Sequence, residues 1–445
     1  MCSQHTPDDV STVRVLWTDI NGIARGITLP ADQYEHAIDE GIGFANGVME
    51  LTLEPGLLDD PKYGPQSGDM LAVPDPASLM RVGWNEETAV VCSDLRTVDG
   101  EPFDVCGRSV LRRVVDELTN EGFVPRVGVE PEFSLLAPDG EGGWEPYNSR
   151  SSYDFDALDQ SGALISTWTR AMSTAGYELL GIHQESQPGQ YEVNIRYDDA
   201  VSMADGFVFF RQMIRSTARN AGLRATFMPR PYTDEDANGL HFHISLWDDD
   251  LATNRFSSTE DDIAFPAGKH PEKAGVSDIG RHFVGGVLEH MKPLTAICAP
   301  TINSYKRLLP GIWAPVNIAW GPDNRSTVVR LPPELGDSTR IEQRVTDTSA
   351  NPYLALAATL AAGFDGIRNE IDPGEPTMKN AYHEPYERLP RTLPEALNHL
   401  EQCDVLTDAL GDSLVTEFIK LKRDEFDRYQ NYVTEWELNE YRDEF

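Results

Sequence analysis

The chain has 445 residues, enough for a sizeable core and more than one domain, so a small isolated binding module is excluded. Its 73 Asp and Glu residues outnumber the 37 Lys and Arg residues, which leaves a formal net charge of −36 at pH 7. That charge repels nucleic-acid phosphates and anionic lipid head groups, so we expect neither nucleic acid nor a membrane as a partner. Scarce lysine beside excess carboxylate also favours a halophilic protein that stays soluble in concentrated salt.

The cysteines and the first residues indicate the compartment. The five cysteines are scattered and never spaced C-x-x-C, which favours reduced thiols. The first residues lack the basic region and the apolar core of a signal peptide. The longest nearly apolar stretch, 353–364, is too short to span a bilayer. We therefore expect a cytoplasmic protein.

The first part of the chain predicts a small β-rich domain. Residues 12–30 read as a hairpin, because two strand-like runs flank Asn21 and Gly22. Sequence punctuated by Gly and Pro follows, and an amphipathic helix is expected over 109–121. We place a first domain at residues 10–105 and a second at 106–445.

The second domain alternates short strands with helices. The expected helices lie near 160–175, 202–221, 279–296, 351–368 and 393–445, and the acidic segment 248–262 is expected to be a solvated loop. The pattern predicts an α+β fold whose larger domain is an antiparallel sheet with helices outside.

Paired carboxylates stand in the first strand of that sheet. Between Val127 and Leu135 the apolar side chains take one face, which leaves Glu130 and Glu132 together on the other. The two carboxylates are then about 7 Å apart along the strand.

Three further strands also carry polar or ionisable side chains together on one face. Their polar faces hold Glu192, with Glu185 just upstream; His241, His243 and Ser245; and Arg340, Glu342 and Arg344. For one strand alone, a polar face turned to water is the simpler interpretation. If all four faces converge, the five glutamates need cations, and oxygen-rich ligation with one imidazole suits Mg²⁺ or Mn²⁺.

Arginines gather in the same part of an otherwise acidic chain. They are Arg307, Arg325, Arg330, Arg340 and Arg344. Guanidinium groups beside a carboxylate-bound metal are typical of phosphoryl transfer, where positive charge neutralises phosphate oxygens. The chain has neither a G-x-x-x-x-G-K-[ST] loop nor a G-x-G-x-x-G motif, so metals and arginines would have to hold the nucleotide.

At this point the ordered motifs resemble those of the glutamine synthetases over nearly the whole chain. They occupy 129–133, 183–192, 227–231, 238–243, 303–311, 324–326, 340–344 and 351–355. The resemblance implies a β-grasp N-terminal domain, a catalytic domain with an open antiparallel β-barrel, and a dodecamer of two hexameric rings with active sites between neighbouring subunits. It also implies two or three Mg²⁺ or Mn²⁺ ions per site, with ATP as co-substrate.

By position, the resemblance assigns roles to these residues. Glu132, Glu185 and Glu192 would ligate the metal that serves glutamate, and Glu130, His241 and Glu342 the metal on ATP. His243, Ser245, Arg325 and Arg330 would contact ATP, while Arg307, Arg344 and the segment containing Gly239 would bind glutamate. Glu132, Arg325 and Arg344 would act on the transferred phosphoryl group.

Two positions depart from the family. Glutamine synthetases attract ammonium with an Asp in an F-D-G-S-S segment and a Glu in a P-G-x-E-A-P loop. Ala45 and Trp313 stand at those two positions here. An indole offers a flat apolar wall instead of a charge, against which an alkyl chain can lie. Glu50 and Glu54, just downstream of Ala45, are candidates for the base that deprotonates the second substrate.

The sequence therefore predicts an ATP-dependent ligase that joins glutamate to an organic amine through a γ-glutamyl phosphate. This resembles the glutamate–amine ligases of the superfamily, with putrescine or another polyamine as the first choice of substrate. Three alternatives remain open: an ammonia-dependent glutamine synthetase, a non-catalytic ring-forming regulator, and a metallohydrolase.

Overall fold

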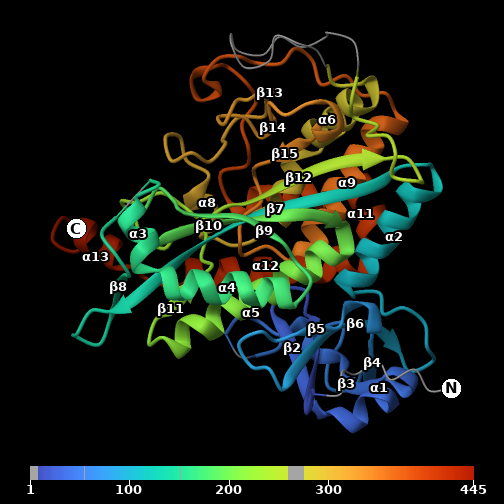
Figure 1. Ribbon diagram of the computed structural model, residues 1–445. Coiled ribbons are helices and arrows are strands. Elements are labelled where there is room, and N and C mark those ends of the chain that lie inside the picture. Colours follow the sequence, from blue (N-terminus) through green and yellow to red (C-terminus); the bar gives the residue numbers. More distant parts are fainter. Residues whose placement is uncertain (1–8, 55, 151, 259–274) are drawn as a thin grey trace.

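The computed structural model describes residues 9–54, 56–150, 152–258 and 275–445, which fold around two sheets (Figure 1). The first sheet has strand order β2-β1-β6-β4-β3, with β5 paired to β6. Its strands are β1 (Thr12–Thr18), β2 (Ala24–Pro30), β3 (Ile42–Ala45), β4 (Asp69–Pro74), β5 (Met80–Arg81) and β6 (Thr88–Thr97), and α1 (Tyr34–Glu40) lies among them. The antiparallel pairing of β1 with β2 confirms the expected hairpin.

The second sheet has the order β13-β14-β15-β12-β7-β10-β9, with β8 and β11 paired to β7. Its strands are β7 (Val124–Pro138), β8 (Trp144–Pro146), β9 (Leu179–Gln184), β10 (Gln190–Asp199), β11 (Arg224–Thr226), β12 (Leu240–Trp247), β13 (Trp320–Pro322), β14 (Val329–Leu331) and β15 (Ile341–Gln343). The pairing is antiparallel as expected, apart from parallel β13 and β14. The sheet curls into a half-barrel, which confirms the α+β class.

Helices precede, separate and follow the strands of this sheet along the chain. They are α2 (Gly107–Asn120), α3 (Phe155–Gln160), α4 (Gly162–Thr174), α5 (Ala200–Asn220), α6 (Asp278–Glu289), α7 (Met291–Cys298), α8 (Ser304–Arg307), α9 (Pro352–Arg368), α10 (Leu393–Leu400), α11 (Asp404–Leu410), α12 (Asp412–Gln430) and α13 (Glu435–Tyr441). The helix expected over 279–296 is two helices, because the chain breaks at His290. The one expected over 393–445 is divided into four.

Aromatic packing beneath β7 explains why that strand is polar on one face only. The Phe133 ring lies 5.4 Å from Trp168 of α4, 5.9 Å from Phe210 of α5 and 5.6 Å from Phe227, measured between ring centroids. Burying such rings supplies much of the free energy that holds α4 and α5 to the sheet. The opposite face is left for the carboxylates.

A buried guanidinium joins the first sheet to the helices of the second. Arg108 of α2 donates to Asp75 at 2.7 Å and to Asp94 at 2.8 Å, both near the first sheet. It also donates at 2.8 Å to Asp205 of α5, whose other oxygen accepts the Tyr353 hydroxyl at 2.6 Å. Removing one partner of such a buried ion pair would strongly destabilise the fold, because the remaining charge would be buried without a counter-ion.

The prediction of a solvated acidic loop over residues 248–262 is wrong in part. Its residues 259–262 lie outside the described residues, but Phe256 is fully buried. Asn254 anchors the segment by donating to the carbonyl of Thr339 at 2.7 Å. In the part of the chain that the structure describes, no helix has the length and apolarity needed to cross a bilayer.

Candidate active site

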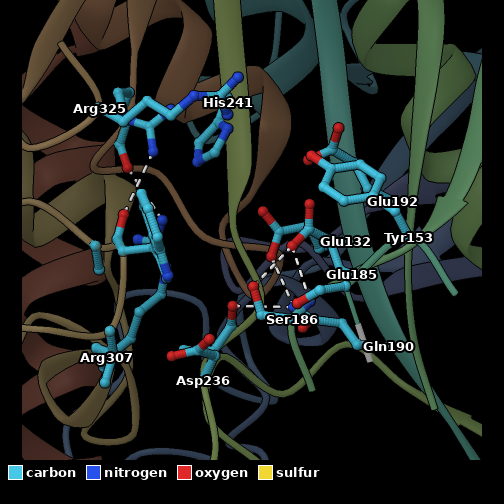
Figure 2. A pocket seen from close by; sticks show the side chains of 16 residues that line it. Glu132, Tyr153, Glu185, Ser186, Gln190, Glu192, Asp236, His241, Arg307 and Arg325 are labelled. Carbon is cyan, nitrogen blue, oxygen red and sulfur yellow. Dashed lines mark hydrogen bonds between the residues drawn. The ribbon is translucent and has the colours of Figure 1, made fainter. Parts of the chain in front are cut away.

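Acidic and imidazole side chains from β7, β9 and β10 stand opposite one another on the polar face of the second sheet. In the strand register, Glu192 of β10 lies between Glu132 of β7 and His183 of β9. Side chains directly opposite in an antiparallel pair are about 5 Å apart at Cβ, so the three share one patch, of which Figure 2 shows Glu132 and Glu192.

The same pattern continues on the other side of β7. Glu130 is paired with His241 of β12, and His243 is paired with Glu342 of β15. The His241 Nδ1 atom lies 3.4 Å from Glu342 and 3.7 Å from Glu130, and the His243 Nε2 atom lies 3.1 Å from Glu130. The four polar strand faces therefore converge.

Three groups of ligand-type atoms result, each with its atoms within 4.8 Å of one another. They are Glu130, Glu192 and His241; Glu130, His243 and Glu342; and His183, Glu185 and Glu192. The resemblance to the glutamine synthetases implies different ligand sets: Glu132 with Glu185 and Glu192, and Glu130 with His241 and Glu342. The grouping differs because Glu130 and Glu192 lie between neighbouring groups.

Glu132 is held by the chain itself. One of its carboxylate oxygens accepts from the Gln190 side-chain amide and from the Gly239 backbone N–H, both at 2.9 Å. Its second oxygen remains available to a ligand in the cavity. The role of Glu132 as a metal ligand stays a prediction.

The pKa values of Glu132 and Glu192 are raised, as expected where several carboxylates lie close together. Burial, and then the charge of Glu185, raises the pKa of Glu132 to about 8. Burial, and then the charge of Glu130, raises the pKa of Glu192 well above its usual range. Burial lowers the pKa of His241 to about 4, and the charge of Arg344 acts in the same direction, so the imidazole is neutral. A carboxylate-rich site with a neutral histidine is arranged to accept a cation.

The donor set fits the metal that the sequence predicts. All candidate ligands are carboxylate oxygens or imidazole nitrogens, which suits a hard divalent cation such as Mg²⁺ or Mn²⁺. When bound, such ions neutralise phosphate oxygens and hold an acceptor carboxylate beside them.

Three of the predicted arginines line the central cavity of ≈ 370 Å³: Arg307, Arg325 and Arg344. Arg307 is buried and donates to the backbone carbonyls of Val345 at 2.7 Å and Arg344 at 3.0 Å. Arg344 is hydrogen-bonded to Glu342 and donates to the Trp313 carbonyl at 3.3 Å. Backbone and carboxylate contacts thus hold these two guanidinium groups in place at the cavity wall.

Arg330 is placed differently. Its guanidinium donates to Glu342 at 2.6 Å and to Asp323 at 2.8 Å, and the side chain is buried behind Glu342. In this position Arg330 orients the carboxylate of Glu342, a candidate metal ligand, and balances its negative charge. Its predicted contact with ATP stays a prediction.

His243 and Ser245 line a second cavity, of ≈ 290 Å³, on the far side of Glu130. Arg340 reaches into it and donates to His243 Nδ1 at 3.1 Å. Glu130 lines this second cavity, while Glu192 and His241, whose ligand-type atoms lie within 4.8 Å of it, line the central one.

Gly239 leaves no space for a side chain beside three site residues. A Cβ at this position would lie 2.8 Å from an Arg307 nitrogen, 2.9 Å from His241 Nε2 and 3.1 Å from a Glu132 oxygen. A side chain at this position would therefore displace at least one of these three functional groups, which meet over the Gly239 backbone.

Trp313 lines the central cavity, but Ala45 of the same chain does not. The Trp313 side chain is 63% exposed, and its φ of 58° is rare for a residue other than glycine. Ala45 lies exposed at the end of β3 in the first sheet. The candidate base Glu50 is fully buried against Tyr63, whose N–H it accepts at 3.2 Å, and it does not line the central cavity.

Several residues in or beside the cavity were not singled out from the sequence. His183 lies 2.9 Å from Glu185 and stacks on Tyr153 with ring centroids 4.7 Å apart. His183 lies on β9 and Glu185 directly follows that strand, so the two-residue spacing that identified Glu130 and Glu132 could also have identified His183. Asp236 and Ser186 come from loops that no periodicity describes.

Comparisons with known proteins agree with this geometry. Residues 2–103 match the model of the glutamine synthetase N-terminal domain and residues 104–441 that of the glutamine synthetase catalytic domain. The glutamine synthetase of Pyrococcus abyssi is 35% identical over 96% of both chains. That of Halobacterium salinarum is 34% identical over 98% of this chain and 94% of its own. A solved structure of GmaS in complex with ADP has a TM-score of 0.87 and 34% identity, covering 98% of this chain and 97% of GmaS.

Fold and site together define an ATP-dependent carbon–nitrogen ligase. The chain belongs to the glutamine synthetase family, as its sequence motifs suggested.

Proposed function

We propose that the protein joins glutamate to an organic amine. The γ-carboxylate of glutamate attacks the γ-phosphorus of ATP, the bond to the bridging oxygen breaks, and ADP leaves. The neutral amine then attacks the carbonyl of the γ-glutamyl phosphate, the carbon–oxygen bond breaks, and phosphate leaves. The nitrogen loses one proton before the attack and a second after it, so the product is a neutral amide.

The side chains of the central cavity suit these two steps. Arg307 and Arg344 hold the glutamate carboxylates, and Arg325 meets the transferred phosphoryl group. His243 and Ser245 contact the nucleotide from the neighbouring cavity. We assign two or three Mg²⁺ or Mn²⁺ ions to the three carboxylate–histidine groups, with Glu132 facing the glutamate side.

The observation that carries the proposal is Trp313 at the cavity wall. An ammonium ion is drawn to a site by negative charge, but the exposed indole offers an apolar surface to the incoming nucleophile. Ala45 removes the second acid of the family. Similarity to GmaS favours a glutamate–amine ligase as well.

Phosphate release in the presence of glutamate, ATP and Mg²⁺ tests the proposal. Ammonium, methylamine, n-butylamine and putrescine are supplied separately, with the same enzyme preparation and without amine as a blank. We expect at least one alkylamine to exceed ammonium in kcat/KM; putrescine is the first choice from the sequence alone. Turnover with ammonium only would overturn the proposal.

Glutamine synthesis from ammonia is the second candidate. It is favoured by the curated relatives, which are named glutamine synthetase, and by the complete carboxylate set. The same assay separates the two, because this candidate requires ammonium to be the best nucleophile.

We further propose that twelve subunits assemble as two hexameric rings in the cytoplasm. Ala45 lies exposed, away from the cavity of its own chain, as expected of a residue that completes a neighbour's site. Light scattering of the purified protein measures the assembly directly.

A further inference from the structure

A larger cavity adjoins the central one. Its volume is ≈ 730 Å³, and it shares two lining residues with the central cavity, Trp313 and Arg325. Pro310, Pro322, Met378 and Tyr382 give it an apolar lining. Its lining also includes the charged or titratable side chains of Asp323, Arg325, Lys379 and His383. Of these only Arg325 belongs to the residues predicted to ligate metal or bind phosphate, so the predicted catalytic roles leave most of this cavity unassigned.

The loop that carries Trp313 is braced between the two cavities. Its φ of 58° costs about 1 kcal/mol for a residue with a side chain, so surrounding contacts must hold it. Arg344 donates to the Trp313 carbonyl at 3.3 Å, and the Tyr382 hydroxyl donates to the next carbonyl, that of Ala314, at 3.0 Å. These contacts hold the backbone that carries the indole, and Trp313 lines both cavities.

We infer that the adjoining cavity holds the substituent of the amine substrate, and that this substituent is an uncharged alkyl chain. The inference rests on the proposed function. The attacking nitrogen must lie in the central cavity, which is already committed to glutamate and to the metal-type residues. An alkyl chain on that nitrogen can leave past Trp313 into the larger, apolar space.

The charges around the cavity disfavour a second ammonium group. Arg325 and Lys379 contribute two cations to its lining, and Lys379 is paired with Glu384 at 3.1 Å. The one carboxylate in the lining, Asp323, is compensated by Arg330 at 2.8 Å. A distal ammonium group would therefore meet the cationic Arg325 in a lining whose carboxylate is already paired, whereas a methyl group would meet prolines and a methionine.

n-Butylamine and putrescine test the charge of the substituent, since both carry a four-carbon chain and putrescine has a second ammonium group. With the parent enzyme we expect kcat/KM to rise from methylamine to n-butylamine and to fall at least about 10-fold from n-butylamine to putrescine. Putrescine as the better substrate would overturn the uncharged substituent while leaving the amine-ligase proposal intact.

Met378→Trp tests the place of the substituent by filling the cavity. Met378 is 51% exposed and lies outside the predicted catalytic set. We expect the variant to lose about 10-fold or more in kcat/KM for n-butylamine while methylamine stays within about two-fold. Val98→Trp, on an exposed turn after β6, adds the same indole far from the cavity and should change neither.

The methylamine rate also reports folding, so a misfolded variant cannot imitate the expected result. Equal losses for both amines, or no loss for either, would overturn the inference. If the parent enzyme uses only ammonium, the proposed function fails first, and the cavity has no substituent to hold.

Discussion

A substitution at Gly239 would disturb several functional side chains of the cavity at once. Arg307, His241 and Glu132 all approach the point where its side chain would begin. The position therefore joins the glutamate-type and metal-type residues through the backbone, and an added methyl group would have to push at least one of them away.

We expect Gly239→Ala to fold but to lose about 100-fold in kcat, because sub-ångström displacement of an arginine and a metal-type histidine disturbs alignment in the transition state. Steady-state phosphate release measures the loss, and circular dichroism checks the fold. Gly162→Ala, where nothing lies within 4 Å of the new Cβ, is the matched control. Near-parental kcat in Gly239→Ala would contradict the tight packing.

Trp313 and Ala45 set the choice of nucleophile in this account. The double variant Trp313→Glu, Ala45→Asp restores the two missing acids and should raise kcat/KM for ammonium while lowering it for larger amines. Competition between ammonium and methylamine, read by product mass, measures the change. An unaltered preference would mean that these positions do not determine specificity.

At the scale of elements, a buried acid pair joins the first sheet to the C-terminal helices. Glu50 lies at the end of the short helix Asn46–Glu50 and Glu417 lies in α12, both almost fully buried. Lys420 pairs with Glu417 at 2.9 Å, and Tyr63 donates its N–H to Glu50. Burial, assisted by the charge of Glu417, raises the pKa of Glu50 from 4.5 to about 7.

This pair makes stability depend on pH. Between pH 4.5 and about 7 the folded chain binds a proton that the unfolded chain has lost, so the free energy of unfolding falls as pH rises through that window. Glu50→Gln mimics the protonated form and should raise the free energy of unfolding at pH 8 by about 1–3 kcal/mol, with little change at pH 5.

Thermal unfolding at the two pH values gives the comparison. Glu54→Gln, whose side chain is 78% exposed, is the control and should shift neither midpoint. Equal shifts of Glu50→Gln at pH 5 and pH 8 would show that the acid pair does not titrate as described.

The strands show how far the sequence could go. Two-residue periodicity was enough to place Glu130 and Glu132 on one face, and the same rule held for Glu192, His241 and Glu342, because these side chains need only their own strand. The burial of Glu50 and Phe256 could not be predicted, because each packs against distant segments. Likewise, the sorting of ligands into groups depends on which strands are neighbours, which local patterns do not contain.

At the scale of the whole molecule, the charge of −36 is the dominant feature. Self-repulsion of this size destabilises the folded chain in dilute buffer, and salt screens it within a Debye length of about 3 Å at 1 M. The protein should therefore unfold at higher temperature in 2 M KCl than in 0.1 M KCl. Differential scanning fluorimetry measures the midpoint, and an unchanged or lower midpoint in KCl would contradict the halophilic interpretation.

The most direct test of the account is a competition for the γ-glutamyl phosphate. The enzyme is given glutamate, ATP and Mg²⁺ with equal concentrations of ammonium and n-butylamine, and the products are identified by mass spectrometry. We predict γ-glutamylbutylamide in excess over glutamine. Glutamine as the sole product would contradict the account.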